Sequence, residues 1–295
     1  IKFPLMLRKL ALCSLLALLS MPLGAQQKKT APKAAVIDLG DALRQGLLAI
    51  EVSGTGGHQG ECLRLSARNL SGKSLRVRIP VGQFFEPGDS SLQTLVVAEQ
   101  HTLALQGKTP ASLLLKTFCA QAGDLSPQPN AAFSAGAMAP EQLCKLLLFI
   151  AQSGKTDSPA AQSAVWCLTN RHSLGGIGDA ELTKFTAELL GRTPPGYRIR
   201  YESREIRPGD RALPGKALVV EGSYQYVIAQ DTKVTMLLLR EDGSLIKKLS
   251  AAEDMIAGEH RGSLHLEVYN LPPGRYIVRW QTREGEVIKD IPVEF

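Results

Sequence analysis

A strict alternation of apolar and polar residues constrains the fold of this chain more than any other feature. Leu63, Leu65 and Ala67 alternate with arginine and serine, and the same pattern returns in residues 75–81. Because neighbouring side chains on a strand point to opposite faces, this period of two predicts strands with one buried and one solvated face. The turn-forming residues 69–73 between the two runs predict that they pair as an antiparallel hairpin.

The first half of the chain predicts strands followed by helices. Further strands are expected at 47–52, 92–98, 102–105 and 113–118. A stretch rich in proline, glycine, alanine and serine, 122–139, then interrupts the strand pattern. Pro140, Ser158 and Asp179 stand where helices should begin. Since strands and helices are segregated, residues 35–192 are expected to form a mixed α+β domain, with antiparallel, sandwich-like strands before the helices.

The segment Thr193–Gly196 marks the expected domain boundary. Its two prolines and glycine cannot extend the preceding helix, which predicts a linker at 193–197. Residues 198–295 carry several alternating runs separated by tight turns such as Asp242-Gly243. This pattern, which contains no convincing helix, predicts an all-β, Ig-like sandwich for the C-terminal domain.

Residues 1–25 have the layout of a secretory signal peptide. Three basic residues come first, the apolar run Leu10–Leu23 follows, and Gly24-Ala25 supplies small residues for cleavage. The run is shorter than the roughly 20 apolar residues of a membrane anchor. An uncleaved anchor and a buried helix are the alternatives. We therefore expect a secreted or periplasmic protein that meets the membrane only during export, with residues 26–34 as a flexible stretch.

The charge of the chain argues against a nucleic-acid partner. The formal net charge is +6, but three of the basic residues lie in the leader, which leaves +3 for the remainder. Nucleic-acid-binding domains concentrate basic residues on one face. Neither half of this chain has such an excess, so we expect no nucleic-acid partner.

Four cysteines follow the leader, and all of them lie within residues 35–192. An even number of cysteines in an exported protein predicts disulfides. The expected pairs are Cys62 with Cys119 and Cys144 with Cys167, although the other pairings are open and four free thiols are the alternative. The spacing shows no clustered Cys/His pattern, so no metal site is expected.

The sequence contains no recognisable catalytic motif. Gly72-Lys73-Ser74 and Gly154-Lys155-Thr156 resemble the end of a phosphate-binding loop but lack its upstream glycine. We therefore predict no catalytic residue and no cofactor. Candidate exposed contacts are His58, in the glycine-rich stretch 54–60, and the adjacent Phe84 and Phe85, which cannot both face one core. Packing of both aromatic rings is the alternative.

Two groups of segments resemble known families. The C-terminal region is similar to Ig-like domains of flagellar hook-capping proteins and to sorting domains of type IX secretion cargo; the segments that carry this resemblance are Tyr224–Tyr226, Asp231–Thr235, Glu241–Gly243, Ala257–His260 and Leu271–Val278. The first half resembles uncharacterised exported proteins of the Bacteroidetes type, through Asn69–Leu75, Ile79–Phe85 and Ala161–Trp166. The first resemblance implies an Ig-like fold and a role in assembly or sorting, and the second implies export.

These observations predict an exported, non-catalytic accessory protein that binds a protein or cell-surface partner through β-rich domains. The alternatives are a secreted, hydrolase-like enzyme with a dispersed site, and secretion cargo with a C-terminal sorting domain. A deep pocket with converging polar groups would favour the enzyme, whereas flat faces and exposed strand edges would favour binding. The sequence leaves the partner and the oligomeric state open.

Overall fold

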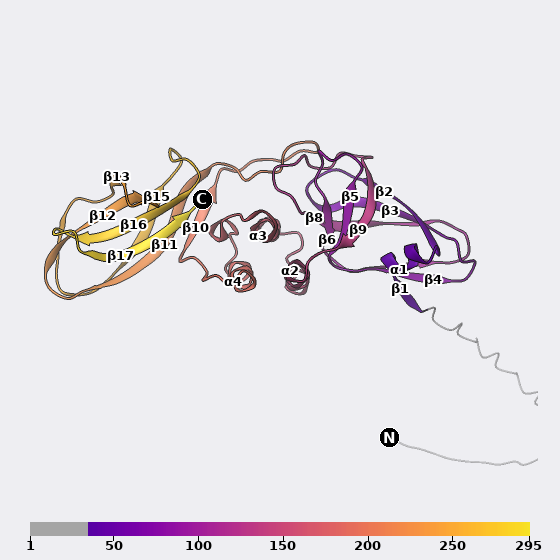
Figure 1. The fold of residues 1–295 in the computed structure, drawn as a ribbon, viewed down its shortest axis with the longest axis horizontal. Helices are drawn as coiled ribbons and strands as arrows, with labels where there is room; N and C mark the ends of the chain where they lie inside the picture. The colour runs from indigo at the N-terminus through magenta and orange to yellow at the C-terminus, as the bar shows by residue number, and fades with distance from the viewer. Residues whose placement is uncertain (1–34) are drawn as a thin grey trace, which may run out of the picture. The chain divides into compact units, whose positions relative to one another are not determined.

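A computed structural model describes residues 35–295 of the chain (Figure 1). The predicted leader, residues 1–25, and the predicted flexible stretch, 26–34, lie outside the described residues. The helices of the described part are α1 (Leu39–Arg44), α2 (Glu141–Gln152), α3 (Pro159–Asn170) and α4 (Ala180–Leu189), with a 3-10 turn η1 (Leu174–Gly176). No helix among residues 35–295 is both long enough and apolar enough to span a membrane.

The fold class expected from the sequence is wrong. Residues 35–295 are mostly β, with 45% strand and 16% helix, and they contain a closed six-stranded barrel together with several other sheets. They do not form an α+β domain followed by an Ig-like sandwich. Alternation along a strand shows which residues face a core, but it does not show which strands pair.

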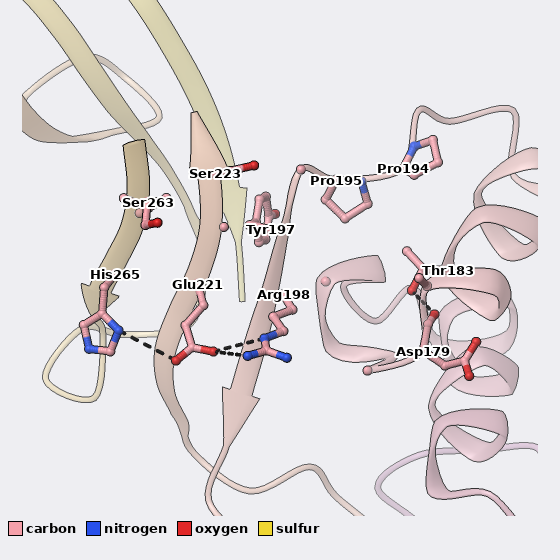
Figure 2. Close-up of a pocket in the computed structure, with 16 residues that line it drawn as sticks. Asp179, Thr183, Pro194, Pro195, Tyr197, Arg198, Glu221, Ser223, Ser263 and His265 are labelled. Atoms are coloured by element: carbon pink, nitrogen blue, oxygen red, sulfur yellow. Dashed lines mark hydrogen bonds and ion pairs between the residues drawn. The ribbon is translucent and has the colours of Figure 1, made fainter. Parts of the chain in front are cut away.

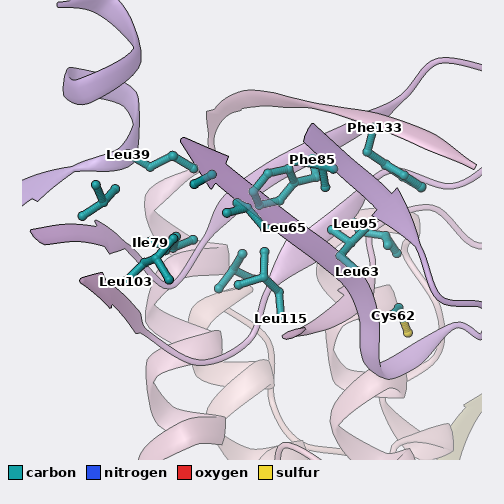
Figure 3. Packing of buried hydrophobic residues seen from close by; sticks show 14 of the residues in the cluster. Leu39, Cys62, Leu63, Leu65, Ile79, Phe85, Leu95, Leu103, Leu115 and Phe133 are labelled. Atoms are coloured by element: carbon teal, nitrogen blue, oxygen red, sulfur yellow. The ribbon is translucent and has the colours of Figure 1, made fainter. Parts of the chain in front are cut away.

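The barrel is the largest closed element of the fold. Its strands, in spatial order, are β2 (Leu48–Gly54), β3 (Gln59–Asn69), β8 (Ala111–Cys119), β6 (Leu95–Val97), β5 (Gln83–Pro87) and β9 (Ala132–Met138). All six pairings are antiparallel. Leu63, Leu65, Phe85, Leu95 and Leu115 belong to its core and are almost fully buried (Figure 3). Closure removes the free strand edges that an open sheet would expose.

The predicted hairpin between residues 63 and 81 does not form. The second apolar run becomes β4 (Leu75–Ile79), which pairs with β1 (Val36–Asp38) and β7 (His101–Leu105) in a separate sheet. β3 pairs instead with β2 and β8 of the barrel. The turn residues 69–73 are still a tight connection, because the side chain of Asn69 accepts hydrogen bonds from Ser71 and donates one to the carbonyl of Lys73.

Strand β9 lies where the sequence predicts an interruption. Its residues, Ala-Phe-Ser-Ala-Gly-Ala-Met, have low intrinsic preference for strands. Pairing with β2 on one side and with β5 on the other holds these residues as a strand. Tertiary context therefore overrides local preference at this strand.

The helix starts predicted at two caps are confirmed. The side chain of Ser158 accepts a hydrogen bond from the N–H of Ala160, and that of Asp179 accepts one from the N–H of Leu182. The helices share a buried cluster with the outward side chains of β6 and β8, Val96 and Phe118. The helices therefore cover this side of the barrel, and the barrel strands in turn bury the apolar faces of the helices.

The C-terminal residues form two sheets around one core. One sheet has the order β10 (Tyr197–Tyr201), β11 (Ala217–Ile228) and β15 (Gly258–Glu267). The other contains β12 (Thr232–Arg240), β13 (Leu245–Lys248), β14 (Glu253–Met255), β16 (Arg275–Thr282) and β17 (Val287–Glu294). Val220, Leu238, Val278 and Trp280 lie in the shared core. The predicted turn at Asp242-Gly243 is confirmed, since it joins β12 to β13 and Gly243 has a φ of 84°.

The connection from β10 to β11 returns to the barrel. Ser126 donates a hydrogen bond to the carbonyl of Arg207 (2.8 Å), and its hydroxyl accepts one from the N–H of Gly209 (3.0 Å). Ala212 is fully buried in the same cluster as the barrel core. A segment of the predicted C-terminal domain, 198–295, thus packs against the first half of the chain.

Candidate binding grooves

The disulfides expected from the sequence are absent. Cys62, Cys119, Cys144 and Cys167 are all free thiols, so both expected pairs are wrong. The sulfur of Cys144 faces the carbonyl of Ala139 at 3.3 Å, whereas that of Cys167 faces the carbonyl of Ser173 at 3.5 Å. An even count of cysteines does not fix the directions of their side chains. Burial raises the pKa of Cys62 to about 11 and that of Cys167 to about 12.

We expect alkylation in denaturant to give the same number of adducts with and without reductant, as measured by intact mass. In the native protein Cys144 should react first, because it is half-buried while the other three thiols are buried. Buried thiols with raised pKa values react slowly, since the thiolate is the nucleophile. A Cys144→Ser variant should lose only the fast adduct. Two extra adducts that appear only with reductant would contradict free thiols.

The candidate contact residues from the sequence do not form one exposed site. Phe85 is fully buried in the barrel core, and Phe84 is partly buried against the helix-side cluster. The expectation that both rings are exposed contacts is therefore wrong. The two rings do point to opposite faces of β5, but both faces are covered.

His58 lies in the β2–β3 connection and is half-buried, and burial lowers the pKa of its imidazole. The glycine-rich stretch around it is packed against neighbouring chain. A Cβ atom at Gly54 would lie 2.5 Å from the carbonyl oxygen of Gln128. The carbonyl of His58 accepts a hydrogen bond from the N–H of Cys119 at 3.3 Å. The stretch is thus a structural connection between two barrel strands.

Two open grooves flank the segment Pro194–Tyr197. The first groove has a volume of about 780 Å³ and lies between the η1–α4 region and the outer face of sheet β10-β11-β15 (Figure 2). Its lining residues include Gly175, Asp179, Thr183, Arg198, Glu221, Ser223, Ser263 and His265. They come from two helical elements and three strands, which no local motif in the sequence brings together.

A row of charged side chains crosses the sheet side of the first groove. Strand register places Arg198, Glu221 and His265 side by side on β10, β11 and β15. Arg198 donates to Glu221 at 3.0 Å, and Nδ1 of His265 lies 3.7 Å from the other carboxylate oxygen (Figure 2). The carboxylate of Glu221 thus pairs with Arg198 on one neighbouring strand and lies near the imidazole of His265 on the other.

Asp179, the other acidic residue of the first groove, has a structural role. The carboxylate of Asp179 points away from the sheet (Figure 2) and accepts hydrogen bonds from the N–H of Leu182 and from Nζ of Lys155, both at 2.9 Å. The bond from Leu182 and then that from Lys155 lower the pKa of Asp179. Among residues 35–295, no hydrogen bond joins His265 to Ser223 or Ser263. The groove therefore lacks the nucleophile–base contact of an acyl-transfer enzyme.

The second groove has a volume of about 810 Å³ and shares Gly175, Pro194–Tyr197 and Ser223 with the first. Its other lining residues include Arg192, Tyr224, Gln225, Glu241, Arg275, Tyr276, Ile277, Lys289, Pro292 and Glu294. Glu294 lies between Arg192 and Arg275, at 3.2 and 3.4 Å. Lys289, in contrast, forms no ion pair within the described residues. The groove thus combines aromatic and apolar surface with three basic and three acidic side chains, of which Lys289 has no ion-pair partner among the described residues.

Tyr197 lines both grooves and is held rigidly. Its hydroxyl accepts a hydrogen bond from the N–H of Glu294 at 2.9 Å, and Ser173 donates to the carbonyl of Glu294 at 2.6 Å. A Cβ atom at Gly175 would lie 2.7 Å from the Tyr197 ring, so only glycine permits this close approach. Burial raises the pKa of Tyr197. Sequence reasoning treated 193–197 as a linker and missed its role as a groove wall.

Among residues 35–295, no group of three or more His, Cys, Asp or Glu side chains is placed to hold a metal ion. No protein-family model and no curated protein sequence matches the chain.

Two solved structures show weak similarity. The crystal structure of red sea bream transglutaminase is 9% identical, with a TM-score of 0.19 over 93% of this chain and 34% of that chain. The selenomethionine-labelled β-glucosidase of Kluyveromyces marxianus is 10% identical, with a TM-score of 0.18 over 79% of this chain and 44% of that chain. This chain therefore spans less than half the length of either. Such TM-scores do not indicate a shared fold.

Proposed function

We propose that the chain is a non-catalytic accessory protein, working outside the cytoplasm, that binds a protein partner at the two grooves around Pro194–Tyr197. The observation that carries this proposal is the form of the grooves: both are open and lined by strands, aromatic rings and hydrogen-bonding side chains. Enzyme sites more often enclose the ligand and bring polar groups to one point. The proposed export rests on the leader-like residues 1–25.

The acidic side chains of the first groove, Glu221 and Asp179, support a binding role over a catalytic one. Glu221 is paired with Arg198, and Asp179 caps α4 and contacts Lys155. A general base needs a free lone pair within reach of the proton it removes. Both oxygens of Asp179 and one oxygen of Glu221 are already in structural contacts. Polar side chains on a rigid sheet, in contrast, suit recognition of a surface.

Site-specific photo-crosslinking in the host cell tests this function. A benzoylphenylalanine residue is placed at Ser223 or Ser263 in the first groove, and at the exposed Lys108, on the β7–β8 connection, as a matched control. We expect a discrete adduct with one partner from the groove positions only, recovered from the extracellular or periplasmic fraction.

The outcomes separate the function from the location. Equal labelling from Lys108, or no adduct from either groove position, would contradict the binding function. An adduct confined to the cytosolic fraction would support binding and contradict export.

A further inference from the structure

Strand β11 has an open edge beside the second groove. β10 pairs with β11 only from Ala217 to Gly222, whereas β15 continues along β11 to Ile228. Within the described residues, β11 therefore has no ladder partner on the β10 side from Ser223 to Ile228. Among the described residues, β10 cannot be extended along this edge, because Pro194 and Pro195 precede it and proline has no N–H to donate.

The backbone of this edge is oriented for pairing. Val268 donates to the carbonyl of Leu218, so the even-numbered residues of β11 bond to β15. In an antiparallel ladder the residues between them point their N–H and C=O groups the other way. Ser223, Gln225 and Val227 thus present their backbone groups to the open side. The side chain of Gln225 is occupied elsewhere, since it donates to Glu259 on β15.

The C-terminal end of the neighbouring edge strand β17 is protected, in contrast. The outward N–H and C=O groups of Glu294 are bonded to Tyr197 and Ser173, and Pro292 has no N–H. Lys289 on β17 lies directly opposite the buried Trp280 of β16 in the ladder. The side chain of Lys289 therefore lies on the core side of the sheet, at the rim of the second groove. Lys289 forms no ion pair within residues 35–295, whereas Arg192 and Arg275 both contact Glu294.

We propose that the open edge of β11 binds an extended, acidic peptide segment of the partner by strand addition. The peptide backbone pairs with Ser223, Gln225 and Val227, and a carboxylate on its inward face meets Lys289. Main-chain hydrogen bonds supply affinity in this mode, and side-chain pockets supply selectivity. The inference rests on the proposed function and specifies how the partner is held.

Fluorescence anisotropy with the full chain tests this mode. The probe is a labelled seven-residue peptide of alternating threonine and valine with a central glutamate. Two companion peptides carry a central lysine or N-methyl groups on alternate amides. We expect the glutamate peptide to bind, the lysine peptide to bind several-fold more weakly, and the N-methylated peptide to lose at least tenfold in affinity. Amide exchange should slow at 223–227 when the glutamate peptide is added.

Two matched pairs of variants locate the contacts. Gln225→Pro should abolish binding, whereas Gln225→Thr, which keeps the N–H, should retain it. Lys289→Glu should weaken the glutamate peptide about fivefold and reverse the preference toward the lysine peptide, as expected for one partly exposed ion pair. Lys247→Glu, an exposed lysine on β13, should change neither. Circular dichroism of each variant confirms folding.

Four results would overturn strand addition: no binding of the glutamate peptide, equal binding of the N-methylated peptide, no effect of Gln225→Pro, or a dimer in light scattering that Gln225→Pro dissolves. The last would mean that a second copy occupies the edge. If crosslinks from Ser263 persist in Gln225→Pro while peptides do not bind, the binding function stands and this mode falls. If both fail, both proposals fall.

Discussion

Replacing Phe85 with alanine should lower the free energy of unfolding by about 3–5 kcal/mol, the usual cost of removing a buried aromatic ring. Phe85 is fully buried in the barrel core, where it belongs to the same cluster as Leu63 and Leu115. The closed barrel surrounds the ring with strands on all sides, so the cavity cannot collapse easily. Urea unfolding followed by circular dichroism measures the change.

Phe84→Ala is the matched control, because it removes the same ring from the opposite face of the same strand. Phe84 is only partly buried, so we expect a loss of about 1–2 kcal/mol, within the ordinary range for single substitutions. Equal losses for the two variants would contradict the assignment of Phe85 to the barrel interior.

Gln162→Leu should cost about 2–4 kcal/mol of stability, since it removes a donor from the buried carbonyl of Cys119 and leaves the N–H of Cys119 with only its longer bond to the carbonyl of His58. The Gln162 amide donates to the carbonyl of Cys119 at 2.8 Å and accepts from the N–H of Cys119 at 3.0 Å. This bidentate contact joins α3 to the end of β8. Leucine has a similar volume, so lost hydrogen bonding and not a cavity should dominate the effect.

The same helix offers a control for Gln162. Ser163 is its neighbour, and its hydroxyl bonds only to the carbonyl of Pro159 at an exposed position. Ser163→Ala should therefore change stability by less than about 0.5 kcal/mol. Amide exchange at Cys119 should accelerate in Gln162→Leu and stay unchanged in Ser163→Ala. Unchanged exchange in both would show that the bidentate contact is not significant in solution.

Local signals in the sequence predicted local structure well. The caps at Ser158 and Asp179 and the turn at Asp242-Gly243 depend on residues within three positions of one another, and all three formed as expected. Strand pairing depends on distant residues. The run at 75–79 alternates as expected, but its partners are residues 36–38 and 101–105, which the alternation does not identify. The fold class was wrong for this reason.

The grooves could not be predicted, because they depend on contacts between remote segments. Tyr197 and Gly175 approach closely only after the η1 turn meets β10, and no pattern in either segment signals the other. The disulfide prediction failed similarly, since the number of cysteines is visible in a sequence but the directions of their side chains are not. The adjacent rings Phe84 and Phe85 were correctly expected on opposite faces, but the helices that cover the second face lie some 60 residues further on.

The connection from β10 to β11, which packs against the barrel, limits where this protein can be divided into fragments. A fragment that stops at Arg192 would lose Ala212 from the barrel-side cluster and would leave the hydroxyl of Ser126 without Arg207 and Gly209. Expression of either half alone would therefore expose apolar surface that the intact polypeptide conceals. Moving the cut past this connection does not help, because it separates β10 from its partner β11 and removes Ile199 from the C-terminal core, so residues 35–295 should be expressed together.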